Sequence, residues 1–344
     1  MTMAKTIVDP GPDRLVRLGF AFREAKTLLS AIELDVFTAL STHGPLGLEE
    51  LARRTGVHPR GARDFFDALV SLGLLERDDA GHYCPTPETG RYLTRNSPFY
   101  IGGELEFASA RQFGPWSSLT EALRTGKPQS GARGTENYSA YYAQAAVREN
   151  VAKGMSGGTL LAAEAMAERF PWREYQTLCD VGTAQGCLPV AIARAHRHIR
   201  GVGFDLPPLQ RLFEEYVGQH GLADRLRFQA GDFFKDPLPT ADVLVMGRVL
   251  HNWDLAAKKT LLKKAYEALP VGGSLIVYER LIDDERRSST SGLTASLNML
   301  VMTASGFDFS GADCIGWMKE ADFKDCRVVP LTSILSMVIG TKAK

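Results

Sequence analysis

The second half of the chain alternates short apolar runs with segments that repeat apolar residues at helical spacing. The runs predict strands at 177–182, 201–205, 226–230, 241–246 and 274–279, and a closing pair at 323–329 and 336–340. Helices are expected between them, one ending at His196 and another over 255–269. Strands and helices in this alternating order predict an α/β fold with a mainly parallel sheet covered on both faces.

The first hundred residues have another pattern, that of helices followed by a small ribbon. The predicted elements are a helix over 31–40, two short helices at 48–52 and 62–70, and strands at 74–77 and 82–84. Residues 55–59 join the short helices with helix-turn-helix spacing, and the run Asp78-Asp79-Ala80-Gly81 favours a turn between the strands. The whole segment resembles a winged helix.

Residues 100–173 have a mostly helical pattern, which a polar, glycine-rich run at 126–134 interrupts. We therefore expect three parts. These are a winged-helix domain at 1–100, a helical connector at 101–173 that contributes to a ligand pocket, and a Rossmann-like α/β domain at 174–344.

The charge balance excludes some partners. Across 344 residues, 40 Lys and Arg face 40 Asp and Glu, so the chain lacks the broad positive field of proteins that bind nucleic acid or anionic membranes. Residues 1–13 lack the apolar stretch of a signal peptide and no segment reaches the length of a membrane span, so we expect a cytoplasmic protein. The 5 cysteines contain no C-x-x-C pair, so neither zinc nor another metal is expected. A small molecule is the expected ligand.

Three strand ends have residues suited to a nucleotide-type ligand. The run Asp180-Val181-Gly182-Thr183-Ala184-Gln185-Gly186 lies where a strand becomes a helix, and its glycines allow a tight turn near a ligand. Asp205, at the end of the next strand, is suited to accept hydrogen bonds from ribose hydroxyls. In Gly231-Asp232-Phe233-Phe234, Phe233 is suited to cover an adenine ring and Asp232 to accept from its amino group. These strand ends converge on the crevice where α/β sheets bind ligands.

These runs, together with Gly203-Phe204-Asp205-Leu206-Pro207 and Leu250-His251-Asn252-Trp253-Asp254, resemble the caffeate- and acetylserotonin-type O-methyltransferase family and its bacterial polyketide and phenazine relatives. The resemblance covers nearly the whole chain, because the winged-helix segment resembles that family's dimerisation domain. It implies an S-adenosylmethionine-dependent O-methyltransferase with a Rossmann-like methyltransferase domain. It also implies a homodimer formed through the N-terminal domain, where the apolar helix around 31–40 is expected to meet the partner chain.

The resemblance assigns S-adenosylmethionine binding to particular residues. They are Gly182, Asp205, Asp232 and Phe233, with Leu206 and Trp253 against the adenosine, and Gly247 and Arg248 beside them. Two positions depart from the family. Its plant members usually have a third glycine in the first loop, where this chain has Thr183 and Ala184. A lysine that is common four residues before the histidine is Gly247 here, which leaves Arg248 as the nearest cation.

Methyl transfer to a hydroxyl needs a base, because the hydroxyl is a poor nucleophile until it loses its proton. His251 follows the strand at 241–246, and histidine is the side chain best suited to take a proton near neutral pH. In the resembling family the matching histidine is the catalytic base, and two carboxylates orient it. Glu279 and Asp308 stand at the corresponding positions, Asp308 where the family often has glutamate.

The acceptor pocket is expected beside this base. The stretch 297–303 puts Met299, Met302 and Thr303 near one helical face, and methionine adapts well to flat aromatic ligands. The same spacing is also typical of a plain core. We expect Met155 and Phe107 to close the other side, and Asn252 to contact the acceptor.

Three functions remain open at this point. The first is methyl transfer to an aromatic or polyketide-like hydroxyl, although the acceptor atom, oxygen, nitrogen or carbon, is not determined. The second uses the same cofactor scaffold for hydroxylation, decarboxylation or cyclisation, as some relatives of the family do. The third is a DNA-binding regulator, but Arg60 and Arg63 lie beside Asp64 and Asp67, so the face that would meet phosphates is electrostatically mixed.

Overall fold

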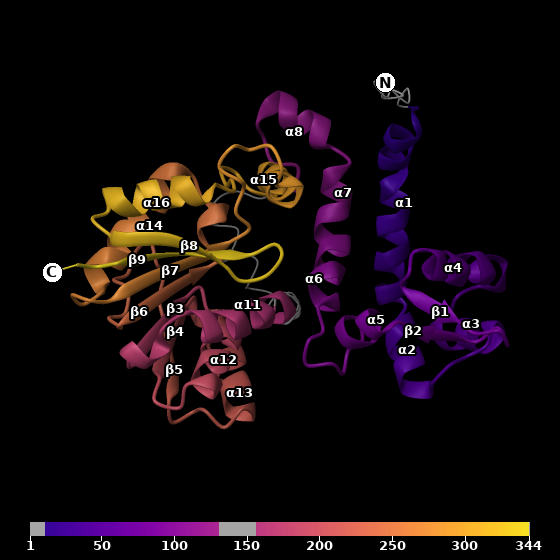
Figure 1. Cartoon of the computed structure of the whole chain (residues 1–344), viewed down its shortest axis with the longest axis horizontal. Coiled ribbons are helices and arrows are strands. Elements are labelled where there is room, and N and C mark those ends of the chain that lie inside the picture. The colour runs from indigo at the N-terminus through magenta and orange to yellow at the C-terminus, as the bar shows by residue number, and fades with distance from the viewer. Residues whose placement is uncertain (1–10, 131–155, 344) are drawn as a thin grey trace, which may run out of the picture. The chain divides into compact units, whose positions relative to one another are not determined.

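The computed structural model describes residues 11–130 and 156–343 of the chain. The chain divides into two compact units, residues 1–109 and 110–344 (Figure 1). The first unit contains helices and a two-stranded ribbon, and the second contains a seven-stranded sheet between helices. The expected fold class, a Rossmann-like α/β domain with a mostly helical N-terminal domain, is therefore confirmed.

The N-terminal unit contains the helix-turn-helix and the ribbon that the pattern predicts. Its elements are α1 (Asp13–Glu33), α2 (Val36–His43), α3 (Leu48–Thr55), α4 (Pro59–Ser71), β1 (Leu75–Arg77), β2 (Tyr83–Pro85), α5 (Pro87–Tyr92) and α6 (Gly102–Phe107). A π-helical turn at Ala108–Gln112 leads into the second unit. Pro59 is the first residue of α4, where its missing N–H costs no helical hydrogen bond. The strands β1 and β2 pair antiparallel.

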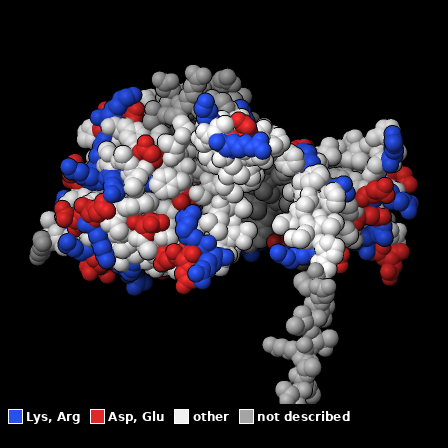
Figure 2. All heavy atoms as spheres, turned by 90° about the horizontal axis from the view of Figure 1, so that it is seen from above, with Lys and Arg blue, Asp and Glu red and all other residues white. Residues whose placement is uncertain are grey.

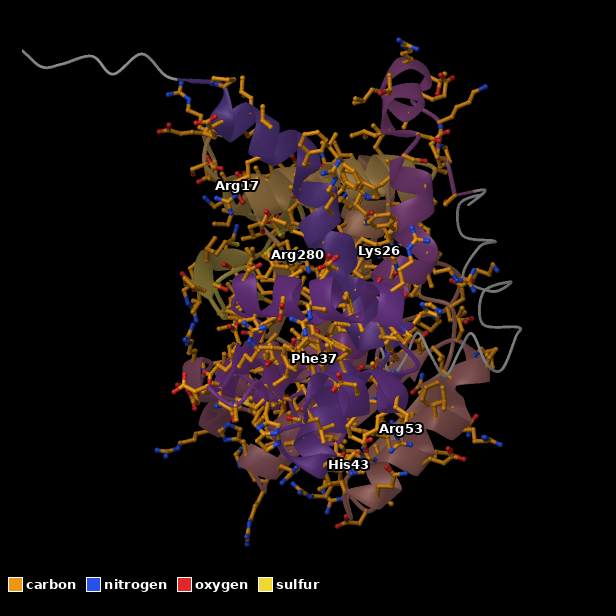
Figure 3. All side chains as sticks on the ribbon, turned by 90° about the vertical axis from the view of Figure 1, so that its right-hand side faces the viewer. Arg17, Lys26, Phe37, His43, Arg53 and Arg280 are labelled. Carbon is orange, nitrogen blue, oxygen red and sulfur yellow. The ribbon has the colours of Figure 1, made fainter. Side chains whose placement is uncertain are left out.

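The prediction of a single helix over 31–40 is wrong. α1 ends at Glu33 and α2 begins at Val36, because Asp35 between them has a φ of 55°, in the left-handed region that interrupts a helix. Figure 3 labels Phe37 of α2. The apolar residues of both helix ends, among them Ile32 and Phe37, pack inside the unit's own core. Their side chains are therefore not available as the partner surface that the sequence suggested.

The C-terminal unit alternates strands and helices as expected. Its elements are α7 (Phe113–Trp116), α8 (Leu119–Thr125), α11 (Ser156–Arg169), β3 (Thr177–Val181), α12 (Cys187–Ala195), β4 (Arg200–Asp205), α13 (Gln210–Gln219), β5 (Leu226–Ala230), β6 (Val243–Gly247), α14 (Leu255–Ala268), β7 (Ser274–Glu279), α15 (Thr290–Met302), α16 (Gly311–Glu320), β8 (Lys324–Pro330) and β9 (Ser336–Thr341). Short 3-10 turns lie at Trp172–Glu174, Pro207–Leu209 and Leu250–Asn252. Each strand predicted for this half is present.

The order of strands in the sheet is β5-β4-β3-β6-β7-β9-β8. The first five run parallel, and β9 is antiparallel to both β7 and β8. The chain moves outward from β3 through β4 to β5, and then returns to the other side of β3 with β6. Such a reversal opens a crevice at the carboxyl ends of the parallel strands. The ends of β3, β4, β5, β6 and β7 therefore share one edge of the sheet.

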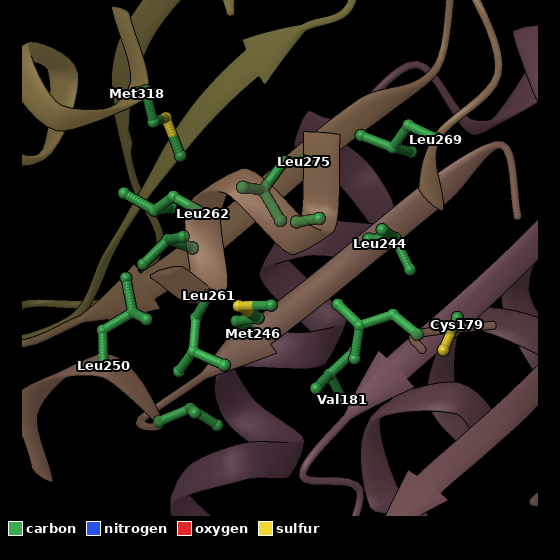
Figure 4. Close-up of a cluster of buried hydrophobic side chains, with 14 of the residues drawn as sticks. Cys179, Val181, Leu244, Met246, Leu250, Leu261, Leu262, Leu269, Leu275 and Met318 are labelled. Atoms are coloured by element: carbon green, nitrogen blue, oxygen red, sulfur yellow. The ribbon is translucent and has the colours of Figure 1, made fainter. Parts of the chain in front are cut away.

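Successive residues of each strand are buried on opposite faces of the sheet, so helices cover both faces. On one face Val181, Leu244 and Met246 pack against Leu261 of α14 and Met318 of α16 (Figure 4). On the other face Leu178, Val243 and Ile276 pack against α11 and α12. Each fully buried aliphatic side chain of this kind stabilises the fold by about 1.5–3 kcal/mol. The strand ends are thus fixed by a close-packed core on both sides.

The surface has no single-sign field on the face that Figure 2 shows, because positive and negative side chains are intermixed there. In the helix-turn-helix, Arg53 and Arg54 both pair with Glu50, and Arg77 of β1 pairs with Asp67 of α4. Within the part of the chain that the structure describes, no helix is both long and apolar enough to span a membrane.

Candidate active site

The loop after β3 brings backbone amides to the carboxyl edge of the sheet. Gly182 and Gly186 have φ values of 81° and 90°, which glycine adopts without strain. Ala184, in the same turn, has a φ of 50°. It therefore also adopts a left-handed conformation, which costs a non-glycine residue about 1–2 kcal/mol. Its N–H donates to Asp205 Oδ2 over 2.9 Å. The loop is thereby tied to the next strand end.

Asp205 ends β4 with a buried carboxylate that backbone amides hold in place. Oδ2 accepts from Ala184, and Oδ1 accepts from the N–H of Leu206 over 2.8 Å. Burial raises the pKa of Asp205 to about 6, even though both amides favour the charged form. A carboxylate oxygen accepts more than one hydrogen bond. Both oxygens of Asp205 therefore retain capacity for a ligand's hydroxyl groups.

The loop after β5 combines a carboxylate with an aromatic cluster. Asp232 accepts from the N–H of Phe234 over 2.9 Å and pairs with Lys235 at 3.0 Å. Partial burial works to raise the pKa of Asp232, but the Phe234 amide and Lys235 together hold it below its ordinary value. The rings of Phe233 and Phe234 meet Trp253 edge-on, with centroids 5.9 and 4.7 Å away. Residues assigned to the adenosine from two distant segments thus lie together.

Packing at the end of β6 explains why this chain has Gly247, and not a lysine, four residues before His251. A Cβ on Gly247 would lie 1.9 Å from the ring of Tyr278, so the tyrosine occupies the space that a longer side chain would need. Arg248 has a φ of 55°, and its N–H donates to the carbonyl of Tyr278 over 3.0 Å. This bond ties the start of the histidine turn to the neighbouring strand β7.

His251 lies in the 3-10 turn after β6, between two carboxylates. Its Nδ1 is 3.5 Å from Glu279 Oε2 and 3.4 Å from Asp308 Oδ1. Both carboxylates are buried, with side chains 1% and 0% exposed, whereas the imidazole is 15% exposed. The shorter arm of Asp308 reaches the imidazole because Ile282, just after β7, pairs with Ser310. The three residues that the sequence assigned to acid–base chemistry are thus adjacent.

The carboxylates control the charge of this histidine. Burial works to lower the pKa of His251, but Glu279 and Asp308 outweigh it, so the pKa lies above the ordinary 6.5. Burial raises the pKa of Glu279, although His251 opposes this shift. One ligand atom from each of the three side chains lies within 4.8 Å of the others, a spacing that also suits a cation. The expected absence of a metal therefore stays a prediction.

A buried lysine lies behind this group. Lys258, in the first turn of α14, is 0% exposed, and its Nζ donates to the carbonyls of Trp253 over 2.5 Å and Phe307 over 3.0 Å. Gly306 brings the same two segments close, since a Cβ there would lie 2.6 Å from the carbonyl oxygen of His251. The His251 turn and the segment before Asp308 are therefore in direct contact.

The residues expected to line the acceptor pocket are only partly brought together. Met299 is buried, and α15 ends at Met302, so Thr303 lies just beyond the helix, where its hydroxyl donates to the carbonyl of Met299 over 2.7 Å. The amide of Asn252 donates to the carbonyls of Arg248 and Val249 in its own turn. Phe107 belongs to α6 in the N-terminal unit. Met155 lies outside the described residues.

Two family models match the chain: an O-methyltransferase domain over residues 116–324 and an O-methyltransferase dimerisation domain over residues 16–95. The chain belongs to the O-methyltransferase family. It is 40% identical to the tetracenomycin polyketide synthesis 8-O-methyl transferase of Streptomyces glaucescens, over 97% of this chain and 98% of that protein. An N,N-dimethyltransferase of Streptomyces rimosus is 36% identical over 90% of each chain. The crystal structure of human N-acetylserotonin methyltransferase in complex with SAM superimposes with a TM-score of 0.91, at 26% identity over 99% of this chain and 100% of that one.

The predicted resemblance, the enzyme class and the cofactor are thereby confirmed: this O-methyltransferase uses S-adenosylmethionine. The residues at the crevice fit that molecule. A nucleoside with hydroxyl and amino donors and a sulfonium charge suits an edge that presents the carboxylates of Asp205 and Asp232 and an aromatic cluster around Phe233.

Sequence reasoning did not assign a role to several residues at this edge. Ala184 and Gly306 permit close backbone approaches, and Lys258 joins two segments. Asp180 is buried within β3, where burial, together with the charge of Asp205 and against a hydrogen bond from Thr183, raises its pKa to about 7. The positive φ of Ala184 and of Arg248 leaves no signature in a sequence. Asp180, in contrast, lies inside the first motif, and this position could have drawn attention to it.

Proposed function

We propose that this O-methyltransferase methylates a hydroxyl on an aromatic, polyketide-type small molecule and that His251 is the general base. The observation that supports this most directly is the pair of buried carboxylates within 3.5 Å of His251 Nδ1, at the edge where the cofactor residues gather. The similarity to a polyketide 8-O-methyl transferase at 40% identity supports the proposed class of acceptor.

In this proposal S-adenosylmethionine, when bound, supplies an electrophilic methyl group. Asp205 would accept from the ribose hydroxyls, since its oxygens are already oriented by Ala184 and Leu206. Asp232 and Phe233 would bind the adenine, and Trp253 and Leu206 would pack on the adenosine. Gly182 gives the first loop its close approach, and Gly247 and Arg248 close the pocket beside β7.

His251 would take the acceptor proton at Nε2. Nδ1 faces the carboxylates of Glu279 and Asp308, so a neutral imidazole keeps its hydrogen on that side and presents a lone pair at Nε2. As the proton arrives, the imidazole becomes a cation between two buried anions, which stabilise it without rearrangement. Asn252, Met299, Met302, Thr303, Phe107 and Met155 remain the proposed contacts of the acceptor.

The test is an incubation of the enzyme with S-adenosylmethionine and hydroxylated aromatic polyketides. A product heavier by one methylene, together with S-adenosylhomocysteine, supports methyl transfer. A product of any other mass would instead support hydroxylation, decarboxylation or cyclisation.

The acid limb of kcat should have its midpoint above pH 6.5, because His251 has a raised pKa and is active only when deprotonated. Full activity in EDTA would agree with a base that works without a cation; a loss that added metal restores would contradict it.

Methyl transfer to nitrogen is the second candidate, because an N,N-dimethyltransferase is 36% identical to this chain. Matched acceptors separate the two reactions. An acceptor pair that differs only in a hydroxyl or an amino group at one ring position identifies the methylated atom by mass and NMR. Transfer to the amine alone would replace the proposed O-methylation.

We propose that the enzyme is a homodimer formed through the N-terminal unit, with α1 at the interface. The side chains Leu15, Val16, Leu18, Phe20 and Phe22 are 65%, 52%, 67%, 48% and 55% exposed, although such apolar clusters are normally covered. The match to a dimerisation domain over residues 16–95 supports this surface. Leu18→Glu should shift the mass measured by light scattering from dimer to monomer, whereas Val271→Glu, at a 57% exposed site in the C-terminal unit, should not. A monomeric wild-type chain contradicts the proposal.

We also propose that the enzyme does not bind nucleic acid and works in the cytoplasm. The ion pairs of Arg53 and Arg54 within the helix-turn-helix, and of Arg77 of β1 with Asp67, support the first point. The five cysteines are free thiols, as is usual in a reducing compartment. Sequence-selective gel shifts at low salt would contradict the absence of nucleic-acid binding. Recovery of the native enzyme outside the cytoplasm would contradict the proposed location.

A further inference from the structure

Lys258 is a buried cation to which neither substrate nor cofactor binding has been assigned. Lysine is almost never fully buried unless it is paired, because desolvation of the ammonium costs free energy. Here the Nζ donates to two backbone carbonyls and lies 3.2 Å from the centre of the Phe307 ring. Burial lowers the pKa of Lys258 to about 8, while Glu279, Asp308 and Asp254 oppose this shift, so the ammonium is charged at neutral pH.

The two carbonyls belong to the segments that hold the acid–base pair. Trp253 lies two residues after His251, and Phe307 directly precedes Asp308. One ammonium therefore bridges the histidine turn and the segment of its carboxylate partner. Gly306 allows the same two segments to touch, with the carbonyl oxygen of His251 2.6 Å from where a Cβ would stand.

The carboxylate of Asp308 depends on this backbone for its position. Among the described residues, neither of its buried oxygens has a hydrogen-bond partner, and His251 Nδ1 lies 3.4 Å from Oδ1. The backbone around it is held by Ser296, which accepts from the Asp308 N–H over 3.2 Å, and by the bond from Ile282 to the Phe309 carbonyl at 3.0 Å. Lys258 is the contact that links this segment to the histidine turn.

We propose that Lys258 is a positioning residue, which holds Asp308 against His251 by bridging the carbonyls of Trp253 and Phe307. The inference rests on the proposed function, because the bridge affects the rate only if His251 is the base. Lys258 touches neither the acceptor nor the methyl donor in this scheme. Its loss therefore lowers kcat through the geometry of the pair and leaves the KM for the acceptor nearly unchanged.

The test is a double-mutant cycle between Lys258 and Asp308, read on kcat. Lys258→Met should lower kcat roughly 10- to 100-fold in the wild-type background, because displacement of a catalytic group by about 1 Å costs up to 100-fold. In the Asp308→Asn background the same change should cost less than about threefold, since the contact it maintains is already lost. Lys258→Arg, which keeps charge and donors, should recover part of the rate. Lys259→Met is the matched control, because Lys259 is a neighbouring lysine whose side chain is 41% exposed and pairs with Glu320.

Equal losses from Lys258→Met in both backgrounds would overturn the inference, and so would a loss confined to the KM for the acceptor. If Lys258→Met does not fold, Lys258→Gln, which retains N–H donors without the charge, takes its place in the same cycle. The same double-mutant cycle can be measured without an acceptor, from the NMR chemical shift of the His251 ring. That resonance is assigned by its absence from the spectrum of His251→Gln. A coupled change in that resonance supports the bridge even if methyl transfer is not observed, and additive changes overturn it.

Discussion

The two ends of the crevice hold their carboxylates in different ways. At the cofactor end, Asp205 and Asp232 accept hydrogen bonds from backbone amides of their own or adjoining loops. At the acid–base end, Glu279 Oε1 accepts from the N–H of His251 over 3.3 Å, whereas Glu279 Oε2 and both oxygens of Asp308 are buried without a hydrogen-bond partner in the described chain. Their neighbour is the imidazole of His251, at 3.5 and 3.4 Å.

Under the proposed function, this difference separates binding from catalysis. A carboxylate with two amide donors is fixed and charged before any ligand arrives, so it provides affinity in the ground state. A buried carboxylate with unsatisfied oxygens is costly to keep charged, and it gains most when a cation forms beside it. In the proposed mechanism, protonation of His251 during the reaction would provide that cation. The acid–base end would then favour the transition state over the resting state.

The largest effect should come from His251→Gln. Without the base, kcat should fall by about 10²- to 10⁴-fold, which is the usual contribution of general base catalysis. The affinity for S-adenosylhomocysteine, measured by calorimetry, should change little, because the cofactor residues lie at the other end. Full turnover of the variant across the pH range would show that His251 is not the base.

The carboxylates of the acid–base end should change both the rate and its pH dependence. Asp308→Asn should lower kcat about 10- to 100-fold, as loss of an orienting partner often does. The midpoint of the acid limb should move to lower pH, since Asp308 and Glu279 raise the pKa of His251 and removal of one charge lowers it. The pH profile of kcat at saturating substrate checks both expectations. A midpoint that stays in place would separate Asp308 from His251.

The same raised pKa has a consequence for stability. A histidine whose pKa is higher in the folded chain stabilises the fold below its unfolded pKa of about 6.5, and this contribution is lost as the pH rises through the folded value. Unfolding by urea at pH 6 and pH 8 should therefore show a larger stability difference for the wild type than for His251→Gln. Equal differences would contradict the coupling.

At the cofactor end, Asp205→Asn should act on affinity alone. The variant loses a charged acceptor, and such hydrogen bonds contribute about 1.5–3 kcal/mol, so the Kd for S-adenosylhomocysteine should rise roughly 10- to 100-fold. At saturating S-adenosylmethionine, kcat should remain within about threefold of the wild type. A large fall in kcat at saturation would mean that binding and catalysis are not separated along the edge.

The two ends also differ in how well the sequence predicts them. Gly182, Asp205 and Phe233 could be proposed as cofactor residues because each lies at or shortly after the end of a predicted strand, and parallel strands end at one edge. The strands themselves follow from apolar runs that are buried on both faces of the sheet.

The residues that the sequence did not reveal depend on contacts between distant segments. Lys258 stands beside Lys259 in a helix with exposed lysines, and only the packing of α14 distinguishes the buried one. The reach of Asp308 depends on the pairing of Ile282 with Ser310. The break between α1 and α2 has neither glycine nor proline to mark it, since Asp35 adopts the left-handed conformation. Local chemistry predicted the cofactor end, whereas tertiary packing determines the acid–base end.

The smallest effect should come from Lys235→Ala, and it sharpens the contrast with Lys258. Lys235 pairs with Asp232 at 3.0 Å, but its side chain is 82% exposed, and exposed ion pairs contribute about 1 kcal/mol or less. The Kd for S-adenosylhomocysteine should therefore change by less than about fivefold, and the change should shrink further in high salt. Asp232 keeps its bond from the Phe234 amide in this variant, so the backbone and not the lysine would still hold the carboxylate. A larger, salt-insensitive loss measured by calorimetry would mean that the cofactor end, too, depends on a lysine for its geometry.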